Sequence, residues 1–352
     1  MINDRSFVSP KIKFGKQSIH QLESVLISEG IENNIIYFID SFFKGNSIIE
    51  KLFKPKFCLV FYVDTIYEPK TSDIDNFVSE IKNKNLFLAD AIIGFGGGSV
   101  MDVAKAVSLL LTNKGKSEDY QGWDLVKNNG IYKVGIPTIS GTGSEVSRTT
   151  VLTGPVKKQG INTLKSMFDY IILDPDLLET VPKAQEFYTA MDCYIHSVEA
   201  LNGCMINNFS MAYAQKGLNL CENYFLGDLT KSDLMIASMF GGYSIVYSEV
   251  GVCHALSYGI SMVYGIAHGE ANCIVFNQLA DYYPNQIEAF RKMIKLHGIK
   301  LRKNLTRNID EKSLDIMVNA TLLMEKPLYN ALGPNWRTIF TKEKIIDLYL
   351  KM

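Results

Sequence analysis

The segment from Ala91 to Lys105 most restricts what this chain can fold into. It reads AIIGFGGGSVMDVAK, an apolar strand followed by closely spaced glycines, a serine and an amphipathic helical pattern. Bare backbone N–H groups at such a turn, with the positive end of the following helix, favour an anion such as a pyrophosphate. A tight strand-to-helix turn that needs positive φ angles explains the glycines as well. The spacing matches neither GxGxxG nor GxxxxGK[ST], so this turn alone leaves both interpretations open.

Strand patterns alternate with helical patterns in the first half of the chain, which predicts a parallel sheet with crossover helices over Ile74–Lys84 and Val100–Leu111. After Asp174 the strand signals fade into long helical patterns. We therefore predict an α/β dinucleotide-binding domain over residues 1–180 and an all-helical metal-binding domain over residues 181–352. The strands are expected at Ile35–Ile39, Cys58–Val63, Ala91–Gly94, Lys133–Ile136 and Tyr170–Leu173.

A second turn, PTISGTGSE over Pro137–Glu145, again follows an apolar strand. Two such turns at one end of a sheet suit a dinucleotide, which needs groups for its pyrophosphate and its nicotinamide ribose. A solvated loop rich in Ser and Thr is the alternative, but it does not explain why the hydroxyls directly follow a strand. The predicted cofactor-binding residues are Asp40, Gly96, Gly97, Gly98, Ser99, Asp102, Thr138, Thr142, Ser147 and Lys165.

Asp40 ends the first strand pattern, IIYFID. An acidic residue there can accept hydrogen bonds from the adenosine ribose and repel a 2′-phosphate, which favours NAD over NADP. A lone Asp at a strand end also caps the helix that follows it, so its position fits either role.

The helical half carries one Asp and three His at ligand spacing. Asp192 and His196 are four residues apart in TAMDCYIHSVEAL, so on a helix both side chains project from one face. His254 follows in GVCHALSYG, and His268 comes fourteen residues later in YGIAHGEAN. A carboxylate with three imidazoles is a complete ligand set for one divalent ion, Zn or Fe(II), with room for an exogenous ligand.

Any one of these histidines is explained more simply as a hydrogen-bonded core residue. Taken together, the four polar side chains interrupt helices otherwise filled with apolar residues, where burying them without a ligand is costly. His20 and His297 lie in polar surroundings and are interpreted as surface residues. Glu199 and Glu270 lie close to the ligands in sequence, and we treat them as supporting partners of the ligands rather than as ligands.

The near-zero net charge argues against partners that carry many negative charges. A net charge of -1, from 36 basic and 37 acidic residues, gives no bulk field to attract nucleic acid or an anionic membrane. No apolar run is long enough to predict a membrane-spanning helix. The six cysteines form no CxxC pair and are interpreted as reduced. We therefore expect a cytoplasmic protein that acts on small molecules.

Five segments carry a resemblance to a known family: GGGSVMDVAK (Gly96–Lys105), PTISGTGSEVS (Pro137–Ser147), DPDLLETVP (Asp174–Pro182), MDCYIHSVEA (Met191–Ala200) and CHALSYGISMVYGIAHGEAN (Cys253–Asn272). In this order they resemble the iron-containing (group III) alcohol dehydrogenase family over nearly the full chain. The resemblance implies an NAD-binding α/β domain, a helical domain and an active site in the cleft between them. It also implies a homodimer. It places Asp192, His196, His254 and His268 on the four metal-ligand positions, Asp40 on the ribose-binding acid, Gly96 to Ser99 on the pyrophosphate turn, and Thr138 and Thr142 near the nicotinamide half.

The chain departs from the family in two ways. Many members carry a further His four residues after the third ligand, and here that position is Tyr258. The chain is also shorter than the commoner members, in its helical domain. We predict Tyr258 and His268 as catalytic residues, with the Tyr258 hydroxyl relaying a proton or binding substrate.

The implied reaction is hydride transfer between a primary alcohol and NAD, with a metal that lowers the pKa of the substrate hydroxyl. The chain looks most similar to the short branch that oxidises C8 of 3-deoxy-manno-octulosonate, so a sugar acid is the predicted substrate. A small alcohol or polyol is the alternative. Arg148 and Arg337 are candidates by residue type for a carboxylate contact.

Two other classes of protein fit parts of the pattern. A lyase or cyclase of the dehydroquinate-synthase type also uses NAD and a metal, but only in a transient redox step. Its metal set has fewer histidines, and it would need basic residues for a phosphate leaving group. A non-catalytic metal or nucleotide sensor would close the same ligands around the ion. Net NADH production excludes the lyase, and an open coordination position with measurable turnover excludes the sensor.

Overall fold

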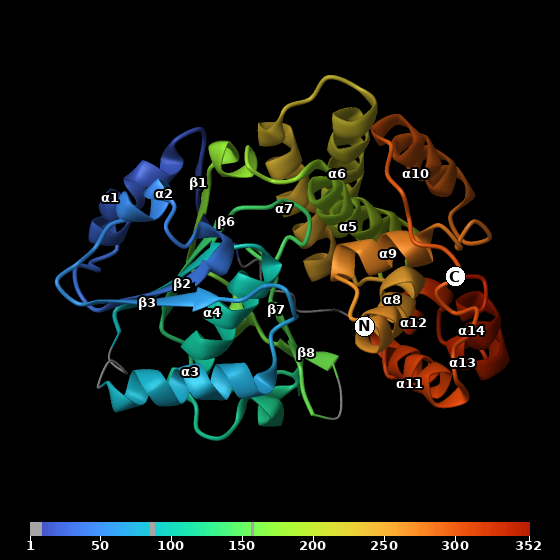
Figure 1. Cartoon of the computed structure of the whole chain (residues 1–352), viewed down its shortest axis with the longest axis horizontal. Helices are drawn as coiled ribbons and strands as arrows, with labels where there is room; N and C mark the ends of the chain where they lie inside the picture. The colour runs from blue at the N-terminus through green and yellow to red at the C-terminus, as the bar shows by residue number, and fades with distance from the viewer. Residues whose placement is uncertain (1–8, 85–88, 156–157) are drawn as a thin grey trace. The chain divides into compact units, whose positions relative to one another are not determined.

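The computed structural model describes residues 9–84, 89–155 and 158–352. The chain divides into two compact units, each shown in Figure 1. One unit comprises Met1–Ile139 and Ser144–Thr180, and the other comprises Ser140–Gly143 and Val181–Met352. The first combines a sheet with helices and the second is helical, which confirms the predicted fold class.

A six-stranded parallel sheet organises the first unit, with its strands in the order β1-β9-β6-β4-β2-β3. The five strands expected from sequence are all present, and β1 joins β9 at one edge. Parallel pairing puts the carboxyl ends of β2 and β4, and the turns that follow them, at one edge of the sheet. The strands are β1 (Lys11–Phe14), β2 (Ile35–Asp40), β3 (Cys58–Val63), β4 (Ala91–Gly96), β6 (Tyr132–Pro137) and β9 (Tyr170–Leu173).

Both faces of this sheet are buried, because its central strands are apolar at consecutive positions. Alternate residues of β2, such as Ile35 and Tyr37, pack in one core cluster with Leu26. On the other face a Cβ at Gly94 would lie 3.0 Å from the Cβ of Ala104, so the helix after β4 packs closely on that strand. The helices of this unit are α1 (Leu22–Ser28), α2 (Ser47–Glu50), α3 (Thr71–Asn83) and α4 (Gly98–Thr112), with short 3-10 turns η1 (Ser18–Gln21), η2 (Ser41–Phe43), η3 (Ser117–Tyr120), η4 (Leu164–Ser166) and η5 (Pro175–Leu178).

A second, three-stranded sheet was not expected from sequence. It contains β5 (Gly122–Trp123), β7 (Thr149–Thr153) and β8 (Lys158–Asn162), in the order β5-β8-β7. β7 and β8 pair antiparallel, while β5 and β8 pair parallel. These strands are short and carry Thr, Gln and Asn, so their hydrophobic pattern is weak.

The second unit is built around α5 (Lys183–Asn202). Every residue from Ala190 to Ala200 is buried, so this part of the helix is enclosed on all sides. A helix buried all round must find partners for its polar side chains. Its companions are α6 (Asn208–Leu226), α7 (Lys231–Tyr247), α8 (Val252–Tyr264), α9 (His268–Phe276), α10 (Pro284–His297), α11 (Glu311–Leu322), α12 (Glu325–Leu332), α13 (Trp336–Ile339) and α14 (Lys342–Tyr349).

None of the described helices is both long enough and apolar enough to cross a bilayer.

Candidate metal centre

Three helices of the second unit bring the predicted ligands together. Asp192 and His196 lie one turn apart on the buried helix α5, as their spacing predicts. His254 lies in the first turn of α8, and His268 is the first residue of α9. Asp192, His196 and His254 are at most 4% exposed. The side chain of His268 is 26% exposed, so this ligand lies on the accessible side of the cluster.

The carboxylate oxygen Oδ1 of Asp192 is the centre of the cluster. It lies 3.1 Å from Nε2 of His254, 3.5 Å from Nε2 of His268 and 3.6 Å from Nε2 of His196. Ligand atoms that share one ion at about 2.0–2.2 Å stand at such separations. Asp192, His254 and His268 offer ligand atoms that all lie within 4.8 Å of one another, close enough to hold a metal ion. This set of three does not include His196, whose Nε2 lies next to the same Asp192 oxygen.

The electrostatics of the cluster favour a positive charge within it. Burial would raise the pKa of Asp192, but the surrounding imidazoles outweigh burial and hold that pKa below its usual value. Burial also opposes a charge on His254, yet the carboxylates of Glu199 and Asp192 raise the pKa of His254 to about 10. Burial lowers the pKa of His196 to about 4, so this imidazole is neutral. A positive charge at the His254 ring, which lies between the two carboxylates, is therefore favourable.

Nδ1 of His196 and Oδ1 of Asn272 are buried and have no hydrogen-bond partner among the described residues. The Asn272 amide nitrogen lies 2.7 Å from Asp192 Oδ1 and 3.2 Å from His268 Nε2. Sequence reasoning missed Asn272. The available signal was its position four residues after His268 on the same helix, which places both on one face.

The two glutamates near the ligands have different partners. Glu199 accepts a hydrogen bond from Nδ1 of His254 at 2.6 Å and is completely buried. Glu270 instead pairs with Arg302, whose Nε lies 2.7 Å from its Oε1. The expectation that both support the ligands directly therefore fits the observed contacts of Glu199 and not those of Glu270.

Tyr258 lies one turn beyond His254 on α8. Its ring is 5.7 Å from the His268 ring in an edge-to-face arrangement. The aromatic residue that replaces the expected histidine is thus next to the ligand that is most exposed.

The first glycine-rich turn joins β4 to α4 in the first unit. Among the described residues no side chain caps the start of α4, so its first N–H groups are available to an anion. A Cβ at Gly96 would lie 2.6 Å from the Val100 side chain, and one at Gly97 would lie 2.5 Å from the Ile139 side chain, so a larger residue at either position would force that side chain to move. Gly98 and Ser99 form the first turn of the helix.

Asp40 ends β2 close to this turn, because a Cβ at Gly96 would lie 3.1 Å from the Asp40 Cβ. One carboxylate oxygen accepts from Phe42 N at 3.0 Å, so Asp40 does cap the turn that follows. Both oxygens also lie 3.2–3.3 Å from the Thr65 hydroxyl. Burial raises the pKa of Asp40 from its ordinary value. Carboxylate oxygens have further lone pairs, so capping and ribose binding are compatible.

Buried polar side chains of α4 form hydrogen bonds with the second turn. Asp102 accepts from Ser144 Oγ at 2.7 Å and from Val151 N at 2.9 Å. The ammonium of Lys105 is completely buried and donates to Ser144 Oγ at 2.9 Å and to Thr149 O at 3.0 Å. The contacts observed for Asp102 are thus structural, and its cofactor role stays a prediction.

The other predicted cofactor residues lie on several elements. Thr138 N donates to Gly96 O at 3.0 Å, which joins the two turns. The Ser147 hydroxyl lies 3.2 Å from the Lys105 ammonium. Lys165 is half-buried in η4. Thr142 belongs to the short stretch that groups with the helical unit.

The two arginines proposed for a carboxylate differ in their surroundings. The Arg148 guanidinium stacks 4.8 Å from the Trp123 ring centroid. Arg337 is exposed, stacks on Trp336 and forms an ion pair with Glu325. Arg337 therefore already has a carboxylate partner.

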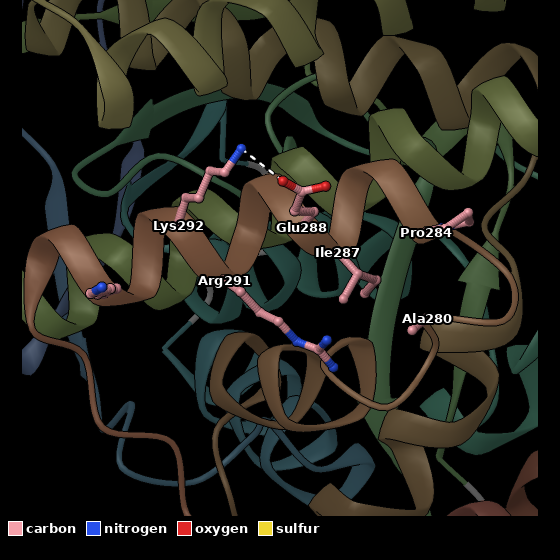
Figure 2. A pocket seen from close by; sticks show the side chains of 7 residues that line it. Ala280, Pro284, Ile287, Glu288, Arg291 and Lys292 are labelled. Atoms are coloured by element: carbon pink, nitrogen blue, oxygen red, sulfur yellow. Dashed lines mark ion pairs between the residues drawn. The ribbon is translucent and has the colours of Figure 1, made fainter.

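A surface hollow of about 350 Å³ lies along α10 (Figure 2). In Figure 2 the Lys292 ammonium turns toward Glu288, with which it forms an ion pair at 2.9 Å. The hollow is open, and none of the predicted site residues lines it, so we do not connect it with the chemistry. Its lining residues are Ala280, Pro284, Ile287, Glu288, Arg291, Lys292 and Lys295.

Comparison with known proteins finds relatives for both halves of the chain. Residues 9–175 match the family described as iron-containing alcohol dehydrogenase, and residues 186–330 match the C-terminal part of the Fe-containing alcohol dehydrogenase family. Sulfoacetaldehyde reductase of Bilophila wadsworthia is 32% identical over 235 residues, which span 64% of this chain and 60% of that protein. 4-Hydroxybutyrate dehydrogenase of Clostridium kluyveri is 28% identical over 320 residues, which span 81% of this chain and 84% of that protein.

Solved structures show the same fold. The sulfoacetaldehyde reductase from Bifidobacterium kashiwanohense in complex with NAD+ has a TM-score of 0.82 at 20% identity, with 98% of each chain covered. A 1,3-propanediol oxidoreductase has a TM-score of 0.81 at 21% identity, again with 98% of each chain covered.

Proposed function

The chain belongs to the iron-containing alcohol dehydrogenase family, and we propose that it transfers a hydride between a primary alcohol and NAD with the help of one divalent metal ion. The cluster of one carboxylate and three imidazoles around Asp192 Oδ1 carries this proposal. Its test is NADH formation, followed by absorbance, with protein loaded with Zn(II) or Fe(II). Net NADH separates a dehydrogenase from a lyase of the dehydroquinate-synthase type and from a metal or nucleotide sensor.

The metal ligands in this proposal are Asp192, His196, His254 and His268. The buried Nδ1 of His196 and Oδ1 of Asn272 have no hydrogen-bond partner among the described residues, which supports a bound ligand at this cluster. Oxygen and nitrogen donors of this kind suit either Fe(II) or Zn(II). A bound divalent cation would supply Lewis acidity, which lowers the pKa of a substrate hydroxyl and polarises a carbonyl.

The residues of the first unit suit NAD. The uncapped start of α4 and the close-packed Gly96 and Gly97 leave backbone N–H groups for a pyrophosphate. Asp40, next to Gly96, would accept from the adenosine ribose. Nicotinamide supplies the hydride chemistry when bound, while the protein holds and orients it.

Replacing Asp40 with glycine is expected to relax the preference for NAD by about 10-fold or more, because the mutation removes a charge that repels a 2′-phosphate. The measurement is kcat/KM with NAD and with NADP. Asp64 is the matched control, since it caps Ile66 N at 2.9 Å after the neighbouring strand β3. Asp64→Gly should change the cofactor ratio much less, because its carboxylate does not lie at the end of β2 beside Gly96. Equal kcat/KM with both cofactors in the parent protein contradicts the assignment.

Tyr258 and His268 are the proposed catalytic residues. Tyr258 lies edge-on to the His268 ring, on the side of the cluster that is most exposed. A phenol hydroxyl donates and accepts hydrogen bonds, so Tyr258 could orient a substrate hydroxyl or pass its proton to water. Exclusion of water from the buried ligands strengthens these contacts.

We propose that the substrate is an alcohol that bears an acid group, with a sugar acid such as 3-deoxy-manno-octulosonate as the specific candidate. The named substrates of two relatives, sulfoacetaldehyde and 4-hydroxybutyrate, also combine a short chain with an anion. Arg148 is the candidate contact for that anion. Its guanidinium has no ion pair among residues 9–84, 89–155 and 158–352, whereas Arg337 already pairs with Glu325.

A substrate panel tests this choice. The eight-carbon sugar acid, 4-hydroxybutyrate and 2-hydroxyethanesulfonate should each give a kcat/KM at least about 10-fold above butanol and propanediol, because one charge-assisted contact contributes about 1.5–3 kcal/mol. Arg148→Met should raise KM for the acids, and Arg337→Met serves as the control. Faster oxidation of the simple alcohols rejects an acid substrate and favours a small alcohol or polyol.

We also propose a cytoplasmic homodimer. The six cysteines are free thiols, which suits a reducing compartment. Sedimentation of the purified protein and fractionation of cells test the two parts of this proposal separately.

A further inference from the structure

Glu199 makes two short hydrogen bonds at the start of α8. It lies on α5, seven residues after Asp192, and its side chain is completely buried. Its Oε2 lies 2.6 Å from His254 Nδ1, and its Oε1 accepts from Cys253 N at 2.6 Å. The two oxygens of one carboxylate thus bind the ring and the backbone of consecutive residues.

This arrangement determines which nitrogen of His254 can bind a metal. A carboxylate only accepts hydrogen bonds, so Nδ1 must carry the proton that lies between His254 and Glu199. The other nitrogen, Nε2, faces Asp192 Oδ1 at 3.1 Å. Nε2 is therefore the nitrogen left to bind a cation, and its orientation is set from the opposite side of the ring.

The bond from Cys253 N keeps Glu199 from turning away. Gly251, which precedes α8, provides no side-chain cap, and Glu199 from α5 takes that role with a negative charge at the positive end of the helix. A Cβ at residue 251 would lie 3.0 Å from Glu199 Oε1, so the backbone packs directly against the carboxylate. Glu199 is held in place by this packing and by its two hydrogen bonds.

We infer that Glu199 is a positioning residue that fixes the protonated nitrogen and the ring orientation of His254, and that it thereby increases the metal affinity of the centre. This inference rests on the proposed metal-dependent function. A carboxylate that accepts from the remote nitrogen also makes the metal-binding nitrogen more basic. Loss of such a partner typically weakens metal binding about 10- to 100-fold.

The chain offers a matched control. Glu270 lies two residues after His268 and pairs with Arg302 instead of a ligand. Glu199→Gln and Glu270→Gln each remove one negative charge close to the cluster with little change in volume. Only Glu199→Gln removes a carboxylate from a ligand ring.

The experiment measures Zn(II) affinity by competition with a chromophoric chelator. Glu199→Gln is expected to raise the Zn(II) Kd about 10- to 100-fold, while Glu270→Gln changes it less than about threefold, as an exposed pair would. In 15N-histidine-labelled protein, the His254 Nδ1 proton should be shifted downfield and protected from exchange in the parent and should lose both properties in Glu199→Gln. An unchanged Zn(II) Kd in a folded Glu199→Gln protein overturns the inference.

The outcomes separate this inference from the proposed function. If the parent binds Zn(II) but forms no NADH with any alcohol, the proposed function fails and the comparison of Kd values still decides the role of Glu199. If Glu199→Gln does not fold, the Nδ1 proton of the parent decides whether Glu199 fixes the ring, and a parent that binds no metal overturns the inferred effect on affinity. An exchangeable, unshifted Nδ1 proton there overturns the inference.

Discussion

Replacing both His254 and His268 with alanine is expected to give a protein that retains no metal and has lost nearly all activity. Two of the three imidazoles around Asp192 Oδ1 would be gone, and the remaining His196 lies 3.6 Å from that oxygen. Loss of several kcal/mol of charge stabilisation corresponds to a fall in kcat/KM of about a thousand-fold or more. Elemental analysis after gel filtration, together with NADH formation, measures both effects.

The control for this double variant is His20→Ala, because His20 is exposed in η1 and distant in sequence from the cluster. His20→Ala should retain a full metal equivalent and parental activity. Circular dichroism establishes that the double variant has kept its helices. A folded double variant that still holds one metal equivalent shows that the metal binds elsewhere.

Replacing Gly143 with alanine is expected to destabilise the helical unit strongly. Gly143 has a φ of 61°, a left-handed conformation that disfavours a side chain. A Cβ there would also lie 2.4 Å from Gly242 Cα and 2.7 Å from Gly242 N, which are backbone atoms of α7. The left-handed backbone conformation and the overlap with Gly242 together should lower the free energy of unfolding by about 2–4 kcal/mol. The midpoint of thermal unfolding should fall by roughly 5–10 °C.

Gly298 allows the two causes to be separated. It has a φ of 65° at the end of α10, and no atom in the described part of the chain lies within 4 Å of the position where its Cβ would be. Gly298→Ala therefore carries the conformational cost alone, about 1–2 kcal/mol. Scanning calorimetry of both variants measures the difference. Equal losses in the two proteins show that the contact with α7 contributes nothing.

The parts of the fold that follow from strong local patterns could be predicted from sequence. The strands at Cys58–Val63 and Tyr170–Leu173 match their predicted bounds, since each is a short apolar run between polar segments. β7 and β8 were missed because polar residues such as Gln159 and Asn162 fill them. Their pairing depends on contacts with distant residues, including the bond from Val151 N to Asp102. No local pattern records such a contact.

The residues of the candidate site could also be predicted only in part, because their partners lie on other elements. The spacing of Asp192 and His196 predicted a shared helix face, and the structure has both on α5. Proximity in sequence could not distinguish Glu199 from Glu270, because the partner of each lies on another element. Asn272 was missed for a different reason: an amide in a helix has many structural uses, and only the three-dimensional arrangement places it beside Asp192.

The C-terminal helix α14 bears on how this protein is made. The Tyr349 hydroxyl donates to Leu256 O on α8 at 2.8 Å and lies 2.7 Å from the Thr321 hydroxyl on α11. A Cβ at Gly259 would lie 2.4 Å from this hydroxyl, so α8 and Tyr349 fit against each other closely. During synthesis on the ribosome, the helix that carries His254 cannot gain this support until residue 349 has been added. Metal that arrives earlier meets an α8 that still lacks its contact with Tyr349.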